Sequence, residues 1–235
     1  SPIVENKKSK FLSYRSRVWQ KTSRAGLPGI FLDNLDFEKY ADFAMSFPLM
    51  LVERKSSYVD FHKENFNDFM HGNLTHLKNE VPTLDDLKLH LSTIFTENRL
   101  KQYIEIRSLD TCGWDCLCNG PAFYTGLLYG NLDETIEFIS SWKKNDILNA
   151  YVEAPKKGLD TILNNKTLLD WGKLILKLSE KGLEKRALLN NKSKNETIYL
   201  RHIKKILQGK KTRSEIIIDL FKKYKTTEFI YNEKN

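Results

Sequence analysis

Near the centre of the chain, residues 101–114 have the sequence "KQYIEIRSLDTCGW", in which polar and apolar side chains alternate. Tyr103, Glu105 and Arg107 alternate with two isoleucines, and a period of two is typical of a β-strand. The pattern predicts a strand whose isoleucines face a core, while a tyrosine, a carboxylate and a guanidinium share the other face. That other face is either an ordinary solvated surface or one wall of a site.

The segments before this strand predict short helices and a hairpin. "DFEKYADFAMSF" (36–47) repeats apolar residues at helical spacing after an aspartate that suits an N-cap. "LMLVERKSSYVDF" (49–61) is typical of two short strands joined by a turn at its serine pair. Thr83, followed three residues later by Asp86, is a variant of the capping box and indicates the start of a further helix.

From residue 118 onward the pattern is helical, with successive segments separated by Gly, Asn-Leu and Pro signals. The longest, residues 166–190, carries leucines and isoleucines at roughly helical spacing. The order is therefore a mixed, strand-containing first half followed by an all-helical part. Because strands and helices do not alternate regularly, the sequence predicts the α+β class.

The net charge of +8 is distributed unevenly over the 235 residues. Residues 156–235 hold 20 Lys and Arg against 9 Asp and Glu. Lysines alternate there with apolar stripes, which favours a solvated helix face over a nucleic-acid surface, because no base-stacking or groove-reading motif accompanies them. We expect no nucleic-acid partner, and no membrane association, since no apolar run approaches about 18 residues.

The cysteines Cys112, Cys116 and Cys118 lie within seven residues. An odd, clustered set does not resemble a secreted disulfide framework and favours a reducing cytoplasm. The C-x3-C-x-C spacing could hold a metal, but a closed zinc site needs about four ligands, and no matching second pair is evident.

Glu105 and Arg107 project from the same face of the predicted strand. A carboxylate suits Mg²⁺, which prefers hard oxygen ligands, and a guanidinium suits a phosphate or a carboxylate. The alternative is a salt bridge on a solvated sheet. No P-loop, nucleophile elbow or dinucleotide fingerprint is present, so metal-assisted electrostatic chemistry is the enzymatic option.

The central block "PTLDDLKLHLSTIFTENRLKQYIEIRSLD" (82–110), followed by a Trp, L-C, P-A-F and G-L-L-Y, resembles the glutamate–cysteine ligases of the plant and proteobacterial type. "SPIVENKKSKFLSYRSRVW" (1–19) is similar to the family's S-P-F and F-L-S-x-R-S segment. "KLILKLSEKGLEKRALLN" (173–190) is similar to part of its helical tail. The likeness covers nearly the whole chain in the family's order.

This resemblance implies a glutamine-synthetase-like fold, in which helices surround an antiparallel sheet. It implies an ATP- and Mg²⁺-dependent ligase that joins the γ-carboxyl of L-glutamate to the amine of L-cysteine through γ-glutamyl phosphate, the first step of glutathione biosynthesis. By matched position, Glu105 is a Mg²⁺ ligand and Arg107 the catalytic residue on the transferring phosphate. Arg15 and Arg99 are substrate-binding residues, although Arg99 could equally brace the sheet.

Family members are longer, and their acidic N-terminal strands supply further ligands. We therefore expect residues 1–131 to form part of the catalytic domain and residues 132–235 a helical region, with the N-terminal half of that domain absent. A non-catalytic binding or assembly module is the alternative. From the cysteine pattern we expect a cytoplasmic protein, and a homo-oligomer is a further expectation.

The sequence departs from the family pattern at several positions. Ser108 and Leu109 stand where Gly-Ala is common, and "FTENRLK" (95–101) replaces the usual F-P-E-V-R element. Cys118 belongs to the family pattern, whereas Cys112 and Cys116 do not. On that ground we expect no redox control through a disulfide.

Overall fold

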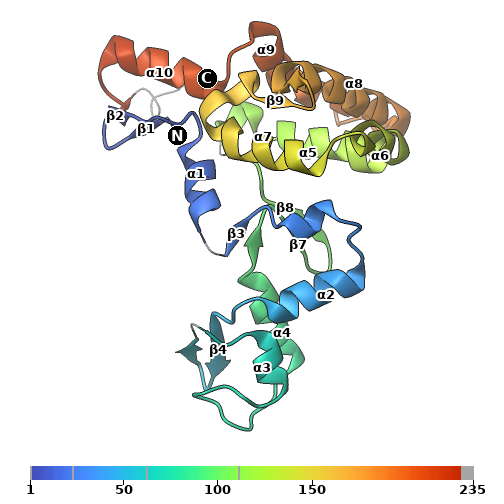
Figure 1. Ribbon diagram of the computed structural model, residues 1–235. Coiled ribbons are helices and arrows are strands. Elements are labelled where there is room, and N and C mark those ends of the chain that lie inside the picture. The colour runs from blue at the N-terminus through green and yellow to red at the C-terminus, as the bar shows by residue number, and fades with distance from the viewer. Residues whose placement is uncertain (1, 23, 62, 111, 229–235) are drawn as a thin grey trace. The chain divides into compact units, whose positions relative to one another are not determined.

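The protein is described here from a computed structural model, shown in Figure 1. The structure describes residues 2–22, 24–61, 63–110 and 112–228. The chain divides into two compact units, and each is treated by itself. The central unit is Trp19–Leu109, and the terminal unit combines Ser1–Val18 with Asp110–Asn235.

The central unit contains short strands and helices. They are β3 (Ala25–Gly26), η1 (Gly29–Leu32), α2 (Phe37–Ser46), β4 (Leu51–Arg54), β5 (Ser57–Asp60), α3 (Phe66–Met70), α4 (Leu84–Ser92), β6 (Phe95–Thr96), β7 (Asn98–Leu100) and β8 (Ile104–Ile106). Strands pair two by two: β4 with β5 and β7 with β8 are antiparallel, and β3 with β6 is parallel.

The helices α2 and α4 begin at the predicted residues because their first N–H groups find side-chain acceptors. The Asp36 carboxylate accepts a hydrogen bond from the Lys39 amide at 2.8 Å. Thr83 and Asp86 form a capping box, in which each side chain accepts from the other's amide, at 3.3 and 2.8 Å. Both predicted helix starts are confirmed.

The predicted hairpin over residues 49–61 is also confirmed. Its turn lies at Lys55 and Ser56, one residue earlier than the serine pair, and both residues have positive φ, 51° and 60°. A two-residue turn of this conformation matches the twist of an antiparallel pair, and it places Val52 opposite Val59.

Packing in the central unit fixes α2 against the strand β7. Tyr40 and Ala44 of α2 are buried with Ile94, which immediately precedes β6. The Tyr40 hydroxyl accepts a hydrogen bond from the Leu100 amide at 3.0 Å, so the helix holds the end of β7 directly. This contact matters because β7 carries part of the candidate site.

The terminal unit is mainly helical (Figure 1). Its elements are β1 (Ile3–Val4), β2 (Lys7–Lys8), η2 (Trp114–Cys116), α5 (Asn119–Thr125), η3 (Gly126–Gly130), α6 (Leu132–Ser140), α7 (Lys144–Lys157), η4 (Gly158–Asp160), β9 (Ile162–Leu163), β10 (Lys166–Thr167), α8 (Leu168–Arg186), η5 (Glu196–Leu200), α9 (Arg201–Gly209) and α10 (Arg213–Tyr224). The helix α1 (Tyr14–Lys21) crosses the boundary between the units.

Small residues let α8 approach the helical segment α5–η3 closely. A Cβ atom on Gly182 would overlap the carbonyl oxygen of Gly126, and one on Gly126 would overlap the Ser179 carbonyl. The Ser179 hydroxyl instead donates to the Phe123 carbonyl at 2.8 Å. These backbones therefore meet because neither glycine carries a side chain.

Two details of the predicted helical part are wrong. The hairpin of β9 and β10 interrupts it, because Asn164 and Asn165 adopt positive φ and form a tight turn. In α7, Pro155 does not end the helix, which continues to Lys157. A proline in the last turn removes one amide, and its own carbonyl accepts from the Leu12 and Ser13 amides at 2.7 and 3.1 Å.

The α+β class is confirmed by this mixture of helices and small, mostly antiparallel sheets. The boundary predicted at residues 131 and 132 concerns the family's catalytic domain, and it stays a prediction. Among the described residues, no helix combines the length and apolar character that a membrane crossing requires.

Candidate active site

The candidate site lies on the hairpin of β7 and β8. Its register places Arg99 directly opposite Glu105 and Leu100 opposite Ile104. The Arg107 amide donates to the Glu97 carbonyl at 2.8 Å, which extends the pairing by one position. Because side chains two residues apart share a face, four charged residues of alternating sign gather on one face of this hairpin.

Glu105 is the centre of this charged face. Arg99 donates to its Oε2 atom from Nε at 2.9 Å and from Nη2 at 2.6 Å. Arg107 donates from Nη1 to the other oxygen, Oε1, at 2.8 Å. Two guanidinium groups therefore approach the two oxygens of one carboxylate.

Burial alone opposes ionisation of Glu105, but the hydrogen bonds and charge of Arg99, followed by those of Arg107, outweigh it and hold the pKa below the usual range. Glu105 is therefore a carboxylate at neutral pH. Its side chain keeps 29% of its surface exposed, so a ligand can still reach it.

Arg99 is more deeply buried, with 8% of its side chain exposed. Besides Glu105, its guanidinium donates to the Ser92 carbonyl and, at 3.2 Å, to the Ile94 carbonyl. These contacts tie the end of α4 to the hairpin. They match the bracing alternative for Arg99, and its predicted substrate contact stays a prediction.

Arg107 lies in an aromatic environment. Its guanidinium carbon is 5.8 Å from the centre of the Trp19 ring and 5.6 Å from that of Phe95. Cation–π contacts of this kind restrict the guanidinium plane without using its N–H groups. Arg107 is therefore held in one orientation on the charged face.

One part of the strand prediction is wrong. Ile104 was expected to face a core, but 69% of its surface is exposed. β8 pairs with β7, and the Arg99–Glu105 pair lies on the buried side of this hairpin. The face of β8 that is covered is therefore the charged one. Tyr103 precedes β8 and is also largely exposed.

Glu97 is a fourth charged residue on this face that the sequence reasoning did not select. It is buried, with 8% of its surface exposed, and it lies across from Arg107. The signal was present in the E-N-R spacing, since Glu97 precedes Arg99 by the same two residues that separate Glu105 from Arg107.

The carboxylate oxygens of Glu97 and Glu105 are hard donors, which suit Mg²⁺. This ion commonly takes one or two carboxylates and completes its shell with water and substrate phosphates. Glu105 fits such a role only as a partial ligand, because both of its oxygens already have arginine partners. Within the part of the chain that the structure describes, no group of three or more His, Cys, Asp or Glu side chains converges on a metal position.

Arg15 belongs to the terminal unit. Its Nη1 atom lies 3.6 Å from Oδ1 of Asp110, whose Oδ2 accepts a hydrogen bond from the Ser13 hydroxyl at 3.1 Å. The structure thus brings Glu105, Arg99 and Arg107 together on one hairpin, whereas Arg15 lies in the other unit, and its role stays a prediction.

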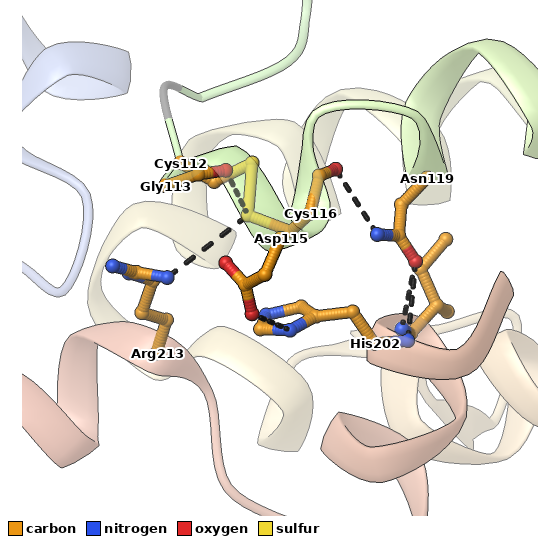
Figure 2. Close-up of a disulfide and its surroundings, with 8 residues drawn as sticks. Cys112, Gly113, Asp115, Cys116, Asn119, His202 and Arg213 are labelled. Carbon is orange, nitrogen blue, oxygen red and sulfur yellow. Dashed lines mark hydrogen bonds and ion pairs between the residues drawn. A yellow bond between two sulfur atoms is a disulfide. The ribbon is translucent and has the colours of Figure 1, made fainter. Parts of the chain in front are cut away.

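The cysteines differ from the expectation. Cys118 is free and exposed, whereas Cys112 and Cys116 form a disulfide (Figure 2). Their α-carbons are 6.0 Å apart because the η2 turn between them brings the two ends of the loop together. The sequence argument against a disulfide is therefore wrong for this pair.

The disulfide loop is anchored by neighbouring polar contacts (Figure 2). The Asn119 side chain donates to the Cys116 carbonyl at 3.0 Å and accepts from the His202 amide at 3.2 Å. Asp115 lies 3.6 Å from the His202 ring. Nothing among these contacts supports the zinc interpretation.

Comparison with known proteins identifies the family of this chain. A family model described as glutamate-cysteine ligase family 2 matches residues 1–228. The match places the chain in a class of ligases. The chain belongs to glutamate-cysteine ligase family 2, and the predicted family is confirmed.

The chain is similar to plant proteins named glutamate–cysteine ligase, chloroplastic. It is 38% identical to that of Solanum lycopersicum over 228 residues and 34% identical to that of Arabidopsis thaliana over 226 residues. Glutamate–cysteine ligase A, chloroplastic, of Oryza sativa subsp. indica is 36% identical over 226 residues. Each match covers 94% of this chain but only 42%, 42% and 45% of the respective relative. The chain therefore spans less than half the length of these relatives.

Proposed function

We propose that this chain is part of an ATP- and Mg²⁺-dependent glutamate–cysteine ligase. The γ-phosphoryl group of ATP is transferred to the γ-carboxylate of L-glutamate, and the amine of L-cysteine then displaces phosphate to form the amide. The observation that supports this proposal is the Arg99–Glu105–Arg107 cluster on β7–β8, inside the segment that matches the family.

The residues of the cluster have separate roles in this proposal. Arg107 neutralises charge on the transferring phosphate, because its guanidinium offers N–H donors in a fixed plane. Glu105 supplies an oxygen ligand, and a bound Mg²⁺ would neutralise phosphate oxygens during transfer. Arg99 holds Glu105 in place, and Arg15 binds the α-carboxylate of glutamate. No side-chain nucleophile is needed.

The glutamine-synthetase-like arrangement is also part of the proposal. The antiparallel pairing of β7 with β8 supports it, and residues 1–131 would then be part of the catalytic domain. The cytoplasmic location and the homo-oligomer stay predictions. The names of the plant relatives describe those proteins as chloroplastic.

A second candidate is a non-catalytic binding or assembly module that retains the fold. It is favoured by one observation: both oxygens of Glu105 are engaged by arginines, as in a structural ion-pair cluster.

The experiment that separates the two candidates is phosphate release from ATP in the presence of Mg²⁺, glutamate and cysteine. It compares the 235-residue chain with a version extended by upstream coding sequence. Phosphate release by the extended protein that requires both amino acids supports the ligase. A folded extended protein without phosphate release supports the non-catalytic module.

A further inference from the structure

The terminal unit contains an open cavity of about 560 Å³ between three segments of the chain. The first segment runs from Lys8 at the end of β2 to Leu12, and the second is the end of α7 with η4. The third is α10 with Lys211 in the loop before it. Phe11, Leu12 and Ile218 supply its apolar lining, and Ile218 is buried. A cavity of this size fits a small molecule and exceeds what one phosphate ion needs.

The walls of the cavity are fixed to one another. The Leu12 amide donates to the Pro155 carbonyl of α7 at 2.7 Å, and the Ser13 amide donates to the same oxygen at 3.1 Å. The cavity is therefore part of the folded unit and does not depend on a single loose side chain.

Cationic side chains dominate the rim, where six lysines face three carboxylates. The lysines are Lys8, Lys10, Lys156, Lys157, Lys211 and Lys222. The carboxylates are Asp160, Glu215 and Asp219. This excess of positive charge attracts anions.

Two of the carboxylates already have local partners. Asp219 pairs with Lys211 and lies 4.0 Å from Lys222, and these lysines, Lys211 first, keep the pKa of Asp219 below its usual range. Glu215 accepts from the Thr212 amide at 2.7 Å in the capping box of α10. Among the described residues of the lining, only Asp160 is left to offset the remaining lysines.

Three of the lysines have no ion pair within the described ranges: Lys8, Lys10 and Lys156. Lys8 acts on Asp219 through its charge without a direct pair. The Lys156 ammonium lies 5.8 Å from the centre of the Phe11 ring, so it stands at the apolar lining of the cavity. Lys157, by contrast, pairs with Glu153 at 3.0 Å.

We propose that this cavity binds a small molecule that carries two or more phosphate groups. The phosphates lie among Lys8, Lys10 and Lys156, since lysine ammonium groups bind phosphate oxygens as point charges. Phe11 lines the cavity beside Lys156 and would contact an attached aromatic or apolar group. The proposal uses none of Glu105, Arg99 and Arg107, and it stands independently of the ligase reaction.

A small ligand is favoured over an RNA strand. The three lysines converge on one cavity from segments far apart in the sequence, whereas strand binding requires a continuous groove with several exposed stacking rings. Among the described residues that line this cavity, Phe11 is the one aromatic ring.

The test is isothermal titration calorimetry with inorganic pyrophosphate and with ADP at physiological salt, on wild type and on matched double variants. Lys10→Gln/Lys156→Gln removes two of the cavity lysines. The control, Lys173→Gln/Lys177→Gln, removes the same charge from exposed positions on α8. We expect the dissociation constant for pyrophosphate to rise about tenfold or more in the cavity variant, because the loss of one charge-assisted hydrogen bond weakens binding by about that factor. The control variant is expected to bind like wild type.

Two further variants separate the sources of binding. If ADP binds more tightly than pyrophosphate, and Phe11→Leu removes the difference, the ligand is a nucleotide. If ADP and pyrophosphate bind equally, the cavity recognises only the phosphate groups. The loss caused by Lys10→Gln/Lys156→Gln is expected to be the same in an Arg107→Ala background, which separates this cavity from the ligase site. The proposal would be overturned by any of three results. The first is that wild type does not bind pyrophosphate, and the second is that both lysine variants lose the same affinity for it. The third is that an RNA oligonucleotide competes with pyrophosphate and that both variants weaken this competition equally.

Discussion

At the residue scale, Arg99 and Arg107 contact the same carboxylate but have different surroundings. Arg99 is buried and also holds two backbone carbonyls, at Ser92 and Ile94. Arg107 lies between aromatic rings and keeps more of its side chain exposed. The first arrangement is that of a structural brace, and the second leaves a cation beside a face that a ligand can reach.

This difference predicts separate effects of two substitutions on the stability of the chain. Arg99→Ala leaves Glu105 half-buried without its main partner, and we expect a loss of about 3 kcal/mol in the free energy of unfolding. Arg107→Ala removes the hydrogen bond to Oε1 of Glu105 from a more exposed position, and we expect a cost of about 1 kcal/mol. Urea denaturation measures both, with Arg201→Ala on the exposed surface of α9 as the control. Equal costs for the two variants would contradict the assignment of Arg99 as the brace.

Among the carboxylates that contribute to the acid stability of the central unit are Glu105 and Asp86, whose pKa values lie below the usual 4.5 for Glu and 3.8 for Asp. For Asp86, burial opposes ionisation, but the hydrogen bond from Arg54 and then the Thr83 cap outweigh it. For Glu105, burial likewise opposes ionisation, and the hydrogen bonds and charge of Arg99 and then of Arg107 outweigh it and lower the pKa. A lowered folded-state pKa means that the folded protein binds fewer protons than the unfolded chain in acid.

We therefore expect full stability above the unfolded pKa values and a progressive loss as the pH falls through the lowered folded values. Urea midpoints measured from pH 7 down to about pH 3 test this expectation. Asp86→Asn should flatten the acid limb, since its side chain no longer ionises. An acid limb as steep in this variant as in wild type would show that other groups control the acid response.

The sequence predicted Glu105, Arg99 and Arg107 as a group because alternation along a strand decides which side chains share a face. It did not predict which face is covered, and so it misplaced Ile104, because burial depends on the neighbouring strands and helices. Glu97 was missed for a related reason, since its buried position across from Arg107 depends on the cross-strand register, although the E-N-R spacing already placed it on the same face as Arg99. The disulfide required two cysteines to meet across a turn that the spacing alone does not specify.

At the element scale, helix starts were predictable where capping is local. Asp36 and Thr83 each accept from an amide three residues ahead, so a short sequence window contains the whole signal. The β9–β10 hairpin was not predicted, because its two-residue strands are too short to show a period. The close crossing of α8 with α5–η3 was also hidden, since its glycines are far apart in the sequence.

That crossing gives a matched pair of glycine substitutions. Gly182→Ala forces a methyl group into the Gly126 carbonyl, and we expect it to lower the free energy of unfolding by about 2 kcal/mol. Gly209→Ala, at the end of α9, meets nothing within 4 Å and should be neutral or slightly stabilising. Thermal or urea unfolding of both variants is the measurement. A neutral Gly182→Ala would mean that the helices can separate without cost.

At the scale of the whole molecule, the family was recognisable because the resemblance runs through nearly the whole chain in one order. The matches cover 94% of this chain but less than half of each relative. At Glu105 the ligand set is partial, since one carboxylate and two arginines position charge but do not complete a magnesium shell.

The central claim is that Glu105 serves catalysis and is not only a structural partner of two arginines. The most direct measurement is formation of γ-glutamylcysteine, detected by mass, from ATP, Mg²⁺, glutamate and cysteine by the extended protein. Glu105→Gln is compared with Glu53→Gln, a matched loss of charge at an exposed position of β4 in the same unit. We predict that Glu105→Gln lowers product formation by about a hundredfold or more while the protein stays folded, and that Glu53→Gln leaves it unchanged. A folded Glu105→Gln protein that forms product at the wild-type rate would contradict the claim.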